Sequence, residues 1–477
     1  MGLETTRLEA GEHAPGDASI NVDTLTGTVH FIGIGGIGMS ALARLLLARG
    51  KQVSGSDKEE NAITKELARL GARTLVGHDA KNLDGAPVSL VVVSTAITDA
   101  NPELKEARAR GIQVMHRSDM LRALTERRKL LAVSGTHGKT TTTGMLAQVF
   151  IDSGLEPEVV VGGIFPRIGS NSYAGKGEYF IAEADESDRT HAKMRSYVSM
   201  ITNIETDHLE NYPGGMAEIC DNMVAFANGS SHACVMCVDD PGCVSILPRI
   251  KVPVVSYGSK TVSPKADYVY EQTAGGFTAW RHGEKLGDLK MAVPGEHNKL
   301  NALGVIAVAM ESGVSFDSAV AALQSFSGVD RRFTLIGTKG GITVVDDYGH
   351  HPTEVRATLH AAREYARTHS LRRVVALFQP HQPGRLRDLW DDFCDSFACA
   401  DLVLLADVYV ARGSQIEGIN SERFAKEVKG CEAQYLGGSI AELPDKVAPL
   451  LKSGDLVLTI GAGDITKVGP ELIQRLK

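Results

Sequence analysis

The chain of 477 residues lacks several features of membrane and secreted proteins. Its apolar runs, such as 90–96 and 402–406, have the length of a strand and fall short of the roughly 18–20 residues that a membrane span needs. It has only seven cysteines, an odd number for a disulfide framework, and residues 1–23 lack the apolar stretch of a signal peptide. We therefore expect a cytoplasmic protein with reduced thiols and a flexible tail over residues 1–23.

Basic charge and aromatic side chains are also scarce. The 50 basic and 58 acidic residues give a net charge of −8, and aromatic residues make up 5% of the chain. A nucleic-acid interface needs a basic surface, and a single-stranded one also needs stacking rings. We therefore expect neither a nucleic acid nor a membrane as a partner. The sequence does not indicate an oligomeric state.

What the chain does contain is a repeated alternation of short apolar runs with helical stretches. This pattern is typical of α/β domains built on parallel sheets. A length of 477 residues suits about three domains, since a domain has roughly 150 residues. We place these domains at residues 24–126, 127–329 and 330–477. Near the first boundary we predict a charged helix over 119–129, and inside the second domain we predict hairpins over 268–290.

The first motif that indicates chemistry is FIGIGGIGMS. Its Gly33, Gly35 and Gly38 follow an apolar strand and open a helix, and Asp57 ends the next strand. Glycines at this spacing let the backbone approach a pyrophosphate at the helix N-terminus. The motif predicts a site for a dinucleotide or another diphosphate. A glycine turn that only packs the helix against the strand is the alternative.

The second motif is VSGTHGKTTTTG, at another junction of strand and helix. Gly135, Gly138, Lys139 and Thr140 form a shortened phosphate loop, because Val133 stands where the full motif has glycine. Backbone N–H groups of such a loop surround a phosphate, the lysine reaches the β- and γ-oxygens, and the hydroxyl binds Mg²⁺. This motif predicts an ATP site.

A cluster of carboxylates ends another apolar strand, in YFIAEADESD. Glu183, Asp185, Glu186 and Asp188 lie within six residues. These groups repel one another unless water or a cation neutralises them. A solvated turn is one interpretation, but the nearby phosphate loop favours Mg²⁺ coordination.

Other polar groups follow strands or begin helices further along the chain. They are Asp207 and His208; His297, Asn298 and Asn301; Arg331 and Arg332; Asp346, Asp347, His350 and His351; and His381 and Arg385. The amides at the helix start suit an adenine edge, but helix capping explains them equally well. For the two consecutive arginines, surface solvation is the simpler interpretation.

Taken together and in this order, the motifs resemble those of the Mur ligase family, from about Val29 to the C-terminus. HFIGIGGIGMS and DDYGHHPTE are the most specific of them. The resemblance implies three α/β domains: a Rossmann-like N-terminal domain, a P-loop-type central ATPase domain and a Rossmann-like C-terminal domain. It also implies a ligase that uses ATP and Mg²⁺ to join L-alanine to the carboxylate of UDP-N-acetylmuramate. A sister ligase that adds a peptide or another amino acid is the alternative within the family.

The resemblance assigns roles residue by residue. The UDP-substrate would contact Gly33, Gly35, Gly36, Gly38, Asp57, His78 and Ser94. ATP would contact Gly135, Thr136, His137, Gly138, Lys139, Thr140, Thr141, His297, Asn298, Asn301 and Asp346. The metal would bind Thr140, Glu183 and His208, and the catalytic residues would be Lys139, His208, Arg332, His351 and Arg385.

One stretch departs from the family pattern. The family usually has FQPHRYTRT where this chain has FQPHQPGRL, so Gln382 replaces an arginine, Gly384 replaces a threonine, and Arg385 remains. Arginine binds a carboxylate through two parallel hydrogen bonds and glutamine cannot, so glycine or serine stay open as amino-acid substrates.

Two other classes of protein explain less of the sequence. An oxidoreductase with two nucleotide sites would leave the GKT motif without a role. An ATP-driven binding switch would leave the glycine loop and DDYGHHPTE without one.

Overall fold

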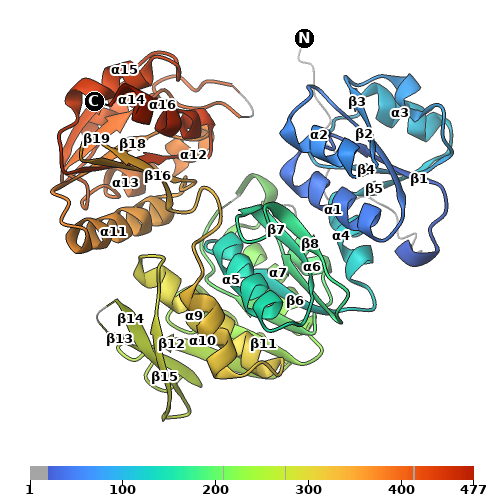
Figure 1. Ribbon diagram of the computed structural model, residues 1–477, viewed down its shortest axis with the longest axis horizontal. Helices are drawn as coiled ribbons and strands as arrows, with labels where there is room; N and C mark the ends of the chain where they lie inside the picture. The colour runs from blue at the N-terminus through green and yellow to red at the C-terminus, as the bar shows by residue number, and fades with distance from the viewer. Residues whose placement is uncertain (1–19, 188, 208, 274, 412–413, 477) are drawn as a thin grey trace. The chain divides into compact units, whose positions relative to one another are not determined.

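The computed structural model describes residues 20–187, 189–207, 209–273, 275–411 and 414–476 (Figure 1). The chain divides into two compact units, each described by itself below. The first contains the described residues up to 272 together with 278–288 and 302–323, and the second contains 273–277, 289–301 and 324–477.

The predicted flexible tail over residues 1–23 is wrong at its C-terminal end, in the part of the chain that the structure describes. Val22–Thr24 form a short 3₁₀-helix, η1, which the Asn21 side chain caps, and Val22 is 2% exposed. These residues therefore belong to the folded unit, whereas residues 1–19 of the predicted tail lie outside the described residues.

The first sheet has five parallel strands in the order β3-β2-β1-β4-β5. Its strands are β1 (Thr28–Ile32), β2 (Gln52–Asp57), β3 (Arg73–Val76), β4 (Val88–Val93) and β5 (Gln113–His116). Its helices are α1 (Ile37–Ala48), α2 (Ala62–Arg69), η2 (Ala80–Leu83), α3 (Pro102–Ala109) and α4 (Arg117–Thr125). Every residue of β1 is buried, as expected for a central strand of a parallel sheet with covered faces.

The predicted helix over 119–129 is wrong at its C-terminal end. Helix α4 ends at Thr125, Glu126 has an extended ψ of 135°, and Arg127 adopts a left-handed φ of 70°. Lys129 already belongs to strand β6. Charged residues continue past the helix end, so the pattern gave no sign of the turn.

The second sheet has ten strands in the order β15-β14-β13-β12-β11-β10-β6-β9-β7-β8. These are β6 (Lys129–Ser134), β7 (Glu158–Phe165), β8 (Ser170–Ala174), β9 (Tyr179–Glu183), β10 (Val198–Ile201), β11 (Ala233–Cys237), β12 (Val254–Ser259), β13 (Tyr268–Thr273), β14 (Gly276–Arg281) and β15 (Glu284–Lys290). The helices are α5 (Lys139–Asp152), α6 (Thr190–Lys193), η3 (Leu209–Asn211), α7 (Gly215–Asn228), α8 (Pro241–Ile246), η4 (Leu247–Arg249), α9 (Glu296–Glu311) and α10 (Phe316–Gln324). Strands β6, β9, β10, β11 and β12 pair in parallel, and β7 and β8 form an antiparallel hairpin.

The third sheet has six strands in the order β16-β17-β21-β18-β19-β20. They are β16 (Thr334–Lys339), β17 (Ile342–Asp347), β18 (Arg373–Phe378), β19 (Leu402–Leu405), β20 (Glu432–Tyr435) and β21 (Asp455–Ile460). The helices are α11 (Pro352–Thr368), α12 (Pro383–Asp388), α13 (Trp390–Cys394), α14 (Ser421–Glu427), α15 (Leu443–Val447), η5 (Ala448–Leu450), η6 (Asp464–Lys467) and α16 (Val468–Arg475). All pairs are parallel except β16 with β17, and apolar clusters cover both faces of the sheet.

Helix α1 of the first sheet is anchored to the β7–β8 hairpin of the second. Arg44 donates to Asn171 (2.5 Å) and pairs with Glu66 of α2. Arg49 forms two hydrogen bonds with the buried Glu158 of β7. The two sheets therefore share polar contacts as well as one apolar core.

The predicted α/β class with three parallel-sheet domains is confirmed. Each predicted domain contains one of the three sheets. The sequence missed strands β3, β5, β7, β8 and β20. Four of them have four or five residues, and the eight-residue β7 contains two consecutive glycines, so none shows a long apolar run.

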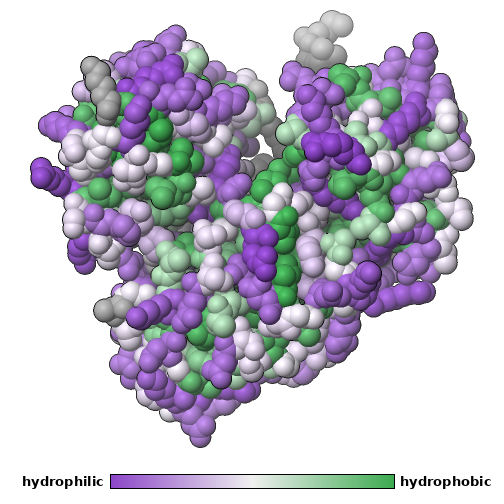
Figure 2. Space-filling model, in the orientation of Figure 1, coloured by the Kyte–Doolittle hydropathy of each residue, from purple (hydrophilic) through white to green (hydrophobic). Residues whose placement is uncertain are grey.

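The surface agrees with a chain of ordinary polarity. The face drawn in Figure 2 mixes hydrophilic and apolar residues. Among the described residues, the exposed large apolar side chains belong to separate elements, and single exposed apolar residues are normal. No helix in that part of the chain is long and apolar enough to cross a membrane.

Truncating the core of α5 tests how far the phosphate-loop helix depends on its packing. Phe150 is fully buried, and its ring packs against that of Tyr179 in a T-shaped arrangement with the ring centroids 4.9 Å apart. We expect Phe150→Ala to lower the free energy of unfolding by about 3–5 kcal/mol, because it leaves a cavity. Urea unfolding followed by circular dichroism measures this. Val262→Ala, at a side chain that is 63% exposed, should change it by less than about 0.5 kcal/mol.

Candidate functional site

The glycine loop after β1 is held by the end of β2. The N–H groups of Gly33 and Ile34 donate to the carbonyl of Ser56 at 2.8 and 2.9 Å. Gly35 N–H donates to Oδ2 of Asp57 at 2.8 Å, and Gly33 has a left-handed φ of 84°. A Cβ on Gly35 would lie 2.8 Å from Asp57, so the loop needs glycine there to stay this close. Asp57 thus shapes the loop in this structure.

Three further predicted UDP-site residues lie at the same edge of the first sheet. Gly36 is the N-cap of α1 and has no side chain to cap it, which leaves N–H groups of the first turn for a ligand. His78 follows β3 and Ser94 follows β4, so both lie at carboxyl ends of parallel strands. Open α/β sheets bind ligands at this edge. The structure therefore brings the predicted set together at one edge.

The phosphate loop joins β6 to α5 and contains two glycines with positive φ angles. Gly135 and Gly138 have φ of 132° and 82°, and Gly138 is the N-cap of α5. A Cβ on Gly135 would lie 2.2 Å from the hydroxyl of Thr202, so only glycine fits. The loop opens α5, whose first N–H groups and dipole favour an anion.

Lys139 is the centre of this loop. Its ammonium donates to the carbonyls of Gly135 (2.7 Å) and Thr136 (2.9 Å) and to Glu186 (2.9 Å). Burial acts to lower the pKa of Lys139, but the carboxylates of Glu186, Asp185 and Glu183 outweigh it, and the pKa is raised. Lys139 therefore carries its positive charge whenever the protein is folded near neutral pH.

The predicted metal ligands Thr140 and Glu183 are adjacent. The hydroxyl of Thr140 donates to Oε2 of Glu183 at 2.9 Å, and Gly162 N–H donates to the same oxygen at 3.1 Å. Glu183 ends β9, which pairs directly with β6, so parallel pairing places it beside the loop. Hydroxyl and carboxylate oxygens are the ligands that Mg²⁺ prefers. The third predicted ligand, His208, lies outside the described residues.

Asp185 lies two residues after Glu183. Arg117 lies 3.3 Å from its Oδ2, and Ser187 N–H donates to its Oδ1. Burial acts to raise the pKa of Asp185, but Lys139 and Arg117 outweigh it and lower the pKa to about 2. The Asp185 carboxylate is therefore ionised near neutral pH and compensated by two cations.

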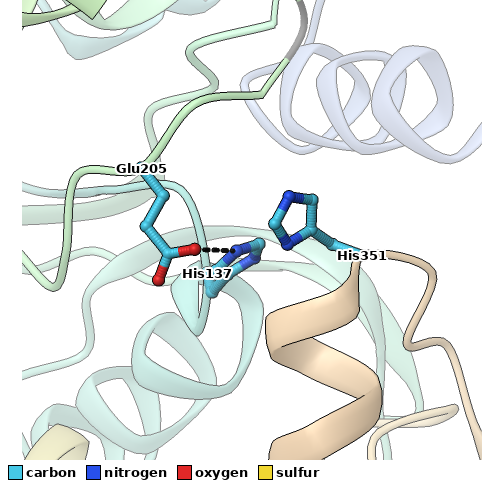
Figure 3. A group of neighbouring side chains, drawn as sticks. All are labelled: His137, Glu205 and His351. Atoms are coloured by element: carbon cyan, nitrogen blue, oxygen red, sulfur yellow. Dashed lines mark ion pairs between the residues drawn. The ribbon is translucent and has the colours of Figure 1, made fainter. Parts of the chain in front are cut away.

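The sequence did not identify the residues that hold the middle of the phosphate loop. Asn203, after β10, accepts from His137 N–H (2.8 Å) and donates to His137 O (3.0 Å), and Thr202 donates to the same carbonyl. The His137 ring lies 3.6 Å from Glu205, as the dashed line in Figure 3 shows. Each of these residues follows β10, which pairs with β6, and that adjacency was the signal that could have found them.

In the second unit, Asp346 is bound within its own sheet. This buried carboxylate accepts from Thr459 (2.6 Å), Thr466 (2.9 Å) and Arg331 (3.3 Å). Its role toward a ribose stays a prediction, because three donors of the chain already bind it. The neighbouring Asp347 is buried too, and burial raises its pKa.

The two arginines and the histidines of the second unit lie around Tyr348. The guanidinium groups of Arg331 and Arg332 lie 4.8 and 5.0 Å from its ring, close enough for cation–π attraction. Arg332 lies 3.8 Å from Glu354, and His350 lies 3.3 Å from the same carboxylate. Arg332 is thus positioned by an aromatic face and an ion pair, and is not a simple solvated surface residue.

His351 and Asn298 have structural roles that the sequence left open. Nδ1 of His351 accepts from Thr353 N–H at 3.3 Å and caps α11. Figure 3 shows the His351 ring at the start of this helix. Asn298 donates to the carbonyl of Pro294 at 2.6 Å, near the start of α9. His297 is exposed and Asn301 is buried on the same helix. The Asn298 bond goes to a carbonyl and is not a helix cap, so the capping and the adenine interpretations of these amides both stay predictions.

The stretch that departs from the family pattern forms the start of α12. Gln382 has a left-handed φ of 67°, and its N–H donates to the carbonyl of Tyr409. His381 stacks on Tyr409 at 5.5 Å, and Arg385 lies in α12. These residues follow β18, at the carboxyl end of the third sheet, where ligands bind in such sheets.

The predicted phosphate loop and the carboxylate cluster thus share one edge of the second sheet, and the predicted diphosphate loop lies at an edge of the first sheet. The chain belongs to the Mur ligase family. Three family models match it in succession: "Mur ligase family, catalytic domain" over residues 28–129, "Mur ligase middle domain" over 133–309, and "Mur ligase, glutamate ligase domain" over 331–463.

Relatives of this family match nearly the whole chain. A UDP-N-acetylmuramate–L-alanine ligase of Trichlorobacter lovleyi is 43% identical over 458 residues, which cover 94% of this chain and 98% of the relative. A UDP-N-acetylmuramate–L-alanine ligase of Myxococcus xanthus is 44% identical, and the match covers 94% of this chain and 95% of that relative. A solved UDP-N-acetylmuramate–alanine ligase of Thermotoga maritima superposes with a TM-score of 0.80 at 30% identity, covering 94% and 99%.

The charge compensation of Asp185 predicts a pH dependence of stability. Its pKa falls from 3.8 in the unfolded chain to about 2 in the folded protein, so its contribution is complete above about pH 4 and is lost as pH falls from 4 to 2. Its side chain is 32% exposed, so we expect a loss of about 1–2 kcal/mol. The free energy of unfolding is measured with urea at pH 5 and at pH 2.5. Its drop between these two pH values should be smaller by this amount in Asp185→Asn than in the wild type.

The matched control for this prediction is Asp221→Asn, which removes a carboxylate from an exposed pair with Arg249. It should leave the pH dependence of the free energy of unfolding as it is in the wild type. An equal loss in Asp185→Asn and the wild type would contradict the assignment.

Proposed function

We propose that the protein is an ATP-dependent ligase that joins L-alanine to the carboxylate of UDP-N-acetylmuramate, an early cytoplasmic step of peptidoglycan synthesis. The observation that carries this proposal is the pairing of Lys139 and Thr140 with the carboxylates at the end of β9, in a chain that relatives with this activity match over 94% of its length.

The reaction that this proposal implies has two steps. The substrate carboxylate attacks the γ-phosphorus of ATP, the bond to the β,γ-bridging oxygen breaks, and an acyl phosphate and ADP form. The amine of L-alanine then attacks the acyl carbon, and inorganic phosphate leaves as the amide bond forms. Both steps bring negative groups together, so the site must supply positive charge.

Lys139 would supply that charge to the triphosphate. In this structure its ammonium uses its three N–H donors on two carbonyls and on Glu186. The phosphate oxygens of ATP would replace some of these partners. Arg332, held by Tyr348 and Glu354, is the corresponding cation of the second unit.

The donor set beside Lys139 fits Mg²⁺. Thr140 and Glu183 offer a hydroxyl and a carboxylate oxygen 2.9 Å apart, and the proposed third ligand is His208. A bound Mg²⁺ would shield phosphate charge and polarise the γ-phosphoryl group. We keep the predicted assignments of His297, Asn298, Asn301 and Asp346 to ATP within the proposal.

The incoming ammonium must lose a proton before it attacks, and a neutral histidine suits this role. His350 lies with Nδ1 3.1 Å from the carbonyl of Tyr348 and 3.3 Å from Glu354, which requires a proton on Nδ1. A neutral His350 then has its lone pair on Nε2. His351 uses Nδ1 as an acceptor, so its neutral form has the proton on Nε2. Of these two neighbours, His350 is the better candidate for the base.

The proposed function is tested by phosphate release with ATP, Mg²⁺ and UDP-N-acetylmuramate, with each amino acid in turn. We expect turnover that requires all three substrates and is fastest with L-alanine. Turnover with a peptide in place of the amino acid would indicate a sister ligase. Reduction of a nicotinamide by the protein would overturn the proposal.

Removing the charge of the phosphate loop should stop this reaction. We expect Lys139→Ala to lower kcat by at least about 10³-fold, because the charged group closest to the triphosphate is lost. Phosphate release measures this, and circular dichroism shows whether the fold is kept. Near-normal turnover in a folded Lys139→Ala protein would remove the ATP site from this loop.

The departure at Gln382 should affect the amino acid alone. We expect Gln382→Arg to change the KM for the amino acid by at least about threefold and the KM for ATP by less, because a guanidinium binds a carboxylate through two hydrogen bonds. Initial rates at varied L-alanine, glycine and serine measure this. An unchanged amino-acid KM would show that position 382 does not line the pocket.

A further inference from the structure

A buried polar cluster lies beneath the ligand-binding edge of the first sheet. Glu103, in the first turn of α3, is fully buried and contacts a side chain of β1, one of β2 and one that follows β3. Its Oε2 lies 2.7 Å from Nε2 of His30, and its Oε1 lies 2.7 Å from the hydroxyl of Ser56 and 2.9 Å from Nδ1 of His78. Nδ1 of His30 lies 2.9 Å from the hydroxyl of Ser54. A buried carboxylate with this many partners is well determined in position.

Glu103 acts as an acceptor in this cluster. Burial acts to raise its pKa, but the hydrogen bonds from His30, Ser56 and His78 outweigh it, and the pKa is lowered. An ionised carboxylate has no proton to donate. Each of its three partners must therefore present a hydrogen to it.

This requirement determines where His78 carries its proton. If Nδ1 had a lone pair, it would face a carboxylate oxygen 2.9 Å away and repel it. The neutral ring therefore has its proton on Nδ1 and its lone pair on Nε2. In the part of the chain that the structure describes, Nε2 of His78 has no hydrogen-bond partner, and the side chain is 17% exposed.

His78 also has the right place to meet a ligand. It follows β3, while Ser56 lies in β2 and the glycine loop follows β1, and these three strands are neighbours in the sheet. Ser56 contacts both the glycine loop and His78. Its carbonyl accepts from Gly33 N–H, and its hydroxyl lies 3.0 Å from Nδ1 of His78. The ring is therefore two strands away from the loop proposed to hold the diphosphate.

We propose that Glu103 is a positioning residue that holds His78 in the tautomer whose Nε2 accepts a hydrogen bond, and that Nε2 accepts it from a donor on the uridine of the substrate. This rests on the proposed function, which puts UDP at this edge. The uridine has two kinds of donor, the imide N3–H of the base and the hydroxyls of the ribose. A cytosine base presents an acceptor at N3, so an imide contact would also select the base.

The donor is identified by measuring the binding of UDP and three analogues by isothermal titration calorimetry. These are 3-methyl-UDP, 2′-deoxy-UDP and 3′-deoxy-UDP, each of which lacks one donor. We expect one of them to bind the wild type about three- to tenfold more weakly than UDP, the effect of one neutral hydrogen bond. If all three bind as UDP does, the proposal is overturned.

Glu103→Gln tests the positioning role. Glutamine can donate as well as accept, so His78 is no longer held in one tautomer. We expect weaker UDP binding and a smaller difference between UDP and the discriminating analogue, with ATP binding unchanged. The matched control is Glu106→Gln, the same change one turn later on α3, where Glu106 pairs with Arg110 near the surface. It should bind all four compounds as the wild type does.

Two measurements decide the proposal if Glu103→Gln fails to fold. ¹⁵N spectra of histidine-labelled wild type, assigned with His78→Asn, should show a His78 ring with its proton on Nδ1. His78→Asn keeps a donor near Glu103 and removes Nε2, so it should bind UDP and the discriminating analogue equally. A proton on Nε2 of His78, or full discrimination in His78→Asn, would overturn the proposal. A wild type that does not bind UDP at all would instead overturn the proposed function.

Discussion

Several carboxylates lie close together at one edge of the second sheet. Their mutual electrostatic repulsion is the constraint on which the first unit depends. Strand β9 ends at Glu183, Asp185 and Glu186 follow it, and the proposed reaction adds a triphosphate to these carboxylates. Lys139 and Arg117 compensate these carboxylates in the structure, and their effect is visible in the lowered pKa of Asp185. A substrate phosphate can then enter by exchanging partners with a lysine that is already charged and positioned, and does not have to organise the site itself.

The glycine loop after β1 solves a related problem with backbone groups. Asp57 and Ser56 of the adjacent strand hold the loop through its N–H groups, and the first turn of α1 remains available for a diphosphate. Helix α1 is in turn anchored to the β7–β8 hairpin, whose Gly162 donates to Glu183. The two edges of the first unit that we propose bind phosphates are thus connected through packed and hydrogen-bonded elements, which favours a substrate site held by rigid supports.

Much of the candidate site was predictable because loops and strand ends have local signals. Gly33, Gly135 and Gly138 adopt conformations that suit glycine, and Lys139 and Thr140 follow them at the spacing that a phosphate requires. Asn203, Glu205 and Glu103 were not predictable in this way. Each contacts the site through strand pairing or a crossover helix, and a lone polar residue after an apolar strand does not indicate its partner.

The sequence by itself determined the α/β class and the family and predicted the two phosphate loops, since apolar periodicity and motif spacing are local properties of the chain. The tertiary structure decided with which partners each polar group forms hydrogen bonds. It showed that His351 caps a helix, that Asp346 binds three donors of its own domain, and that Glu103 is hydrogen-bonded to a histidine 25 residues away. Hydrogen bonds between distant segments depend on the register and order of the strands, and no local pattern specifies these.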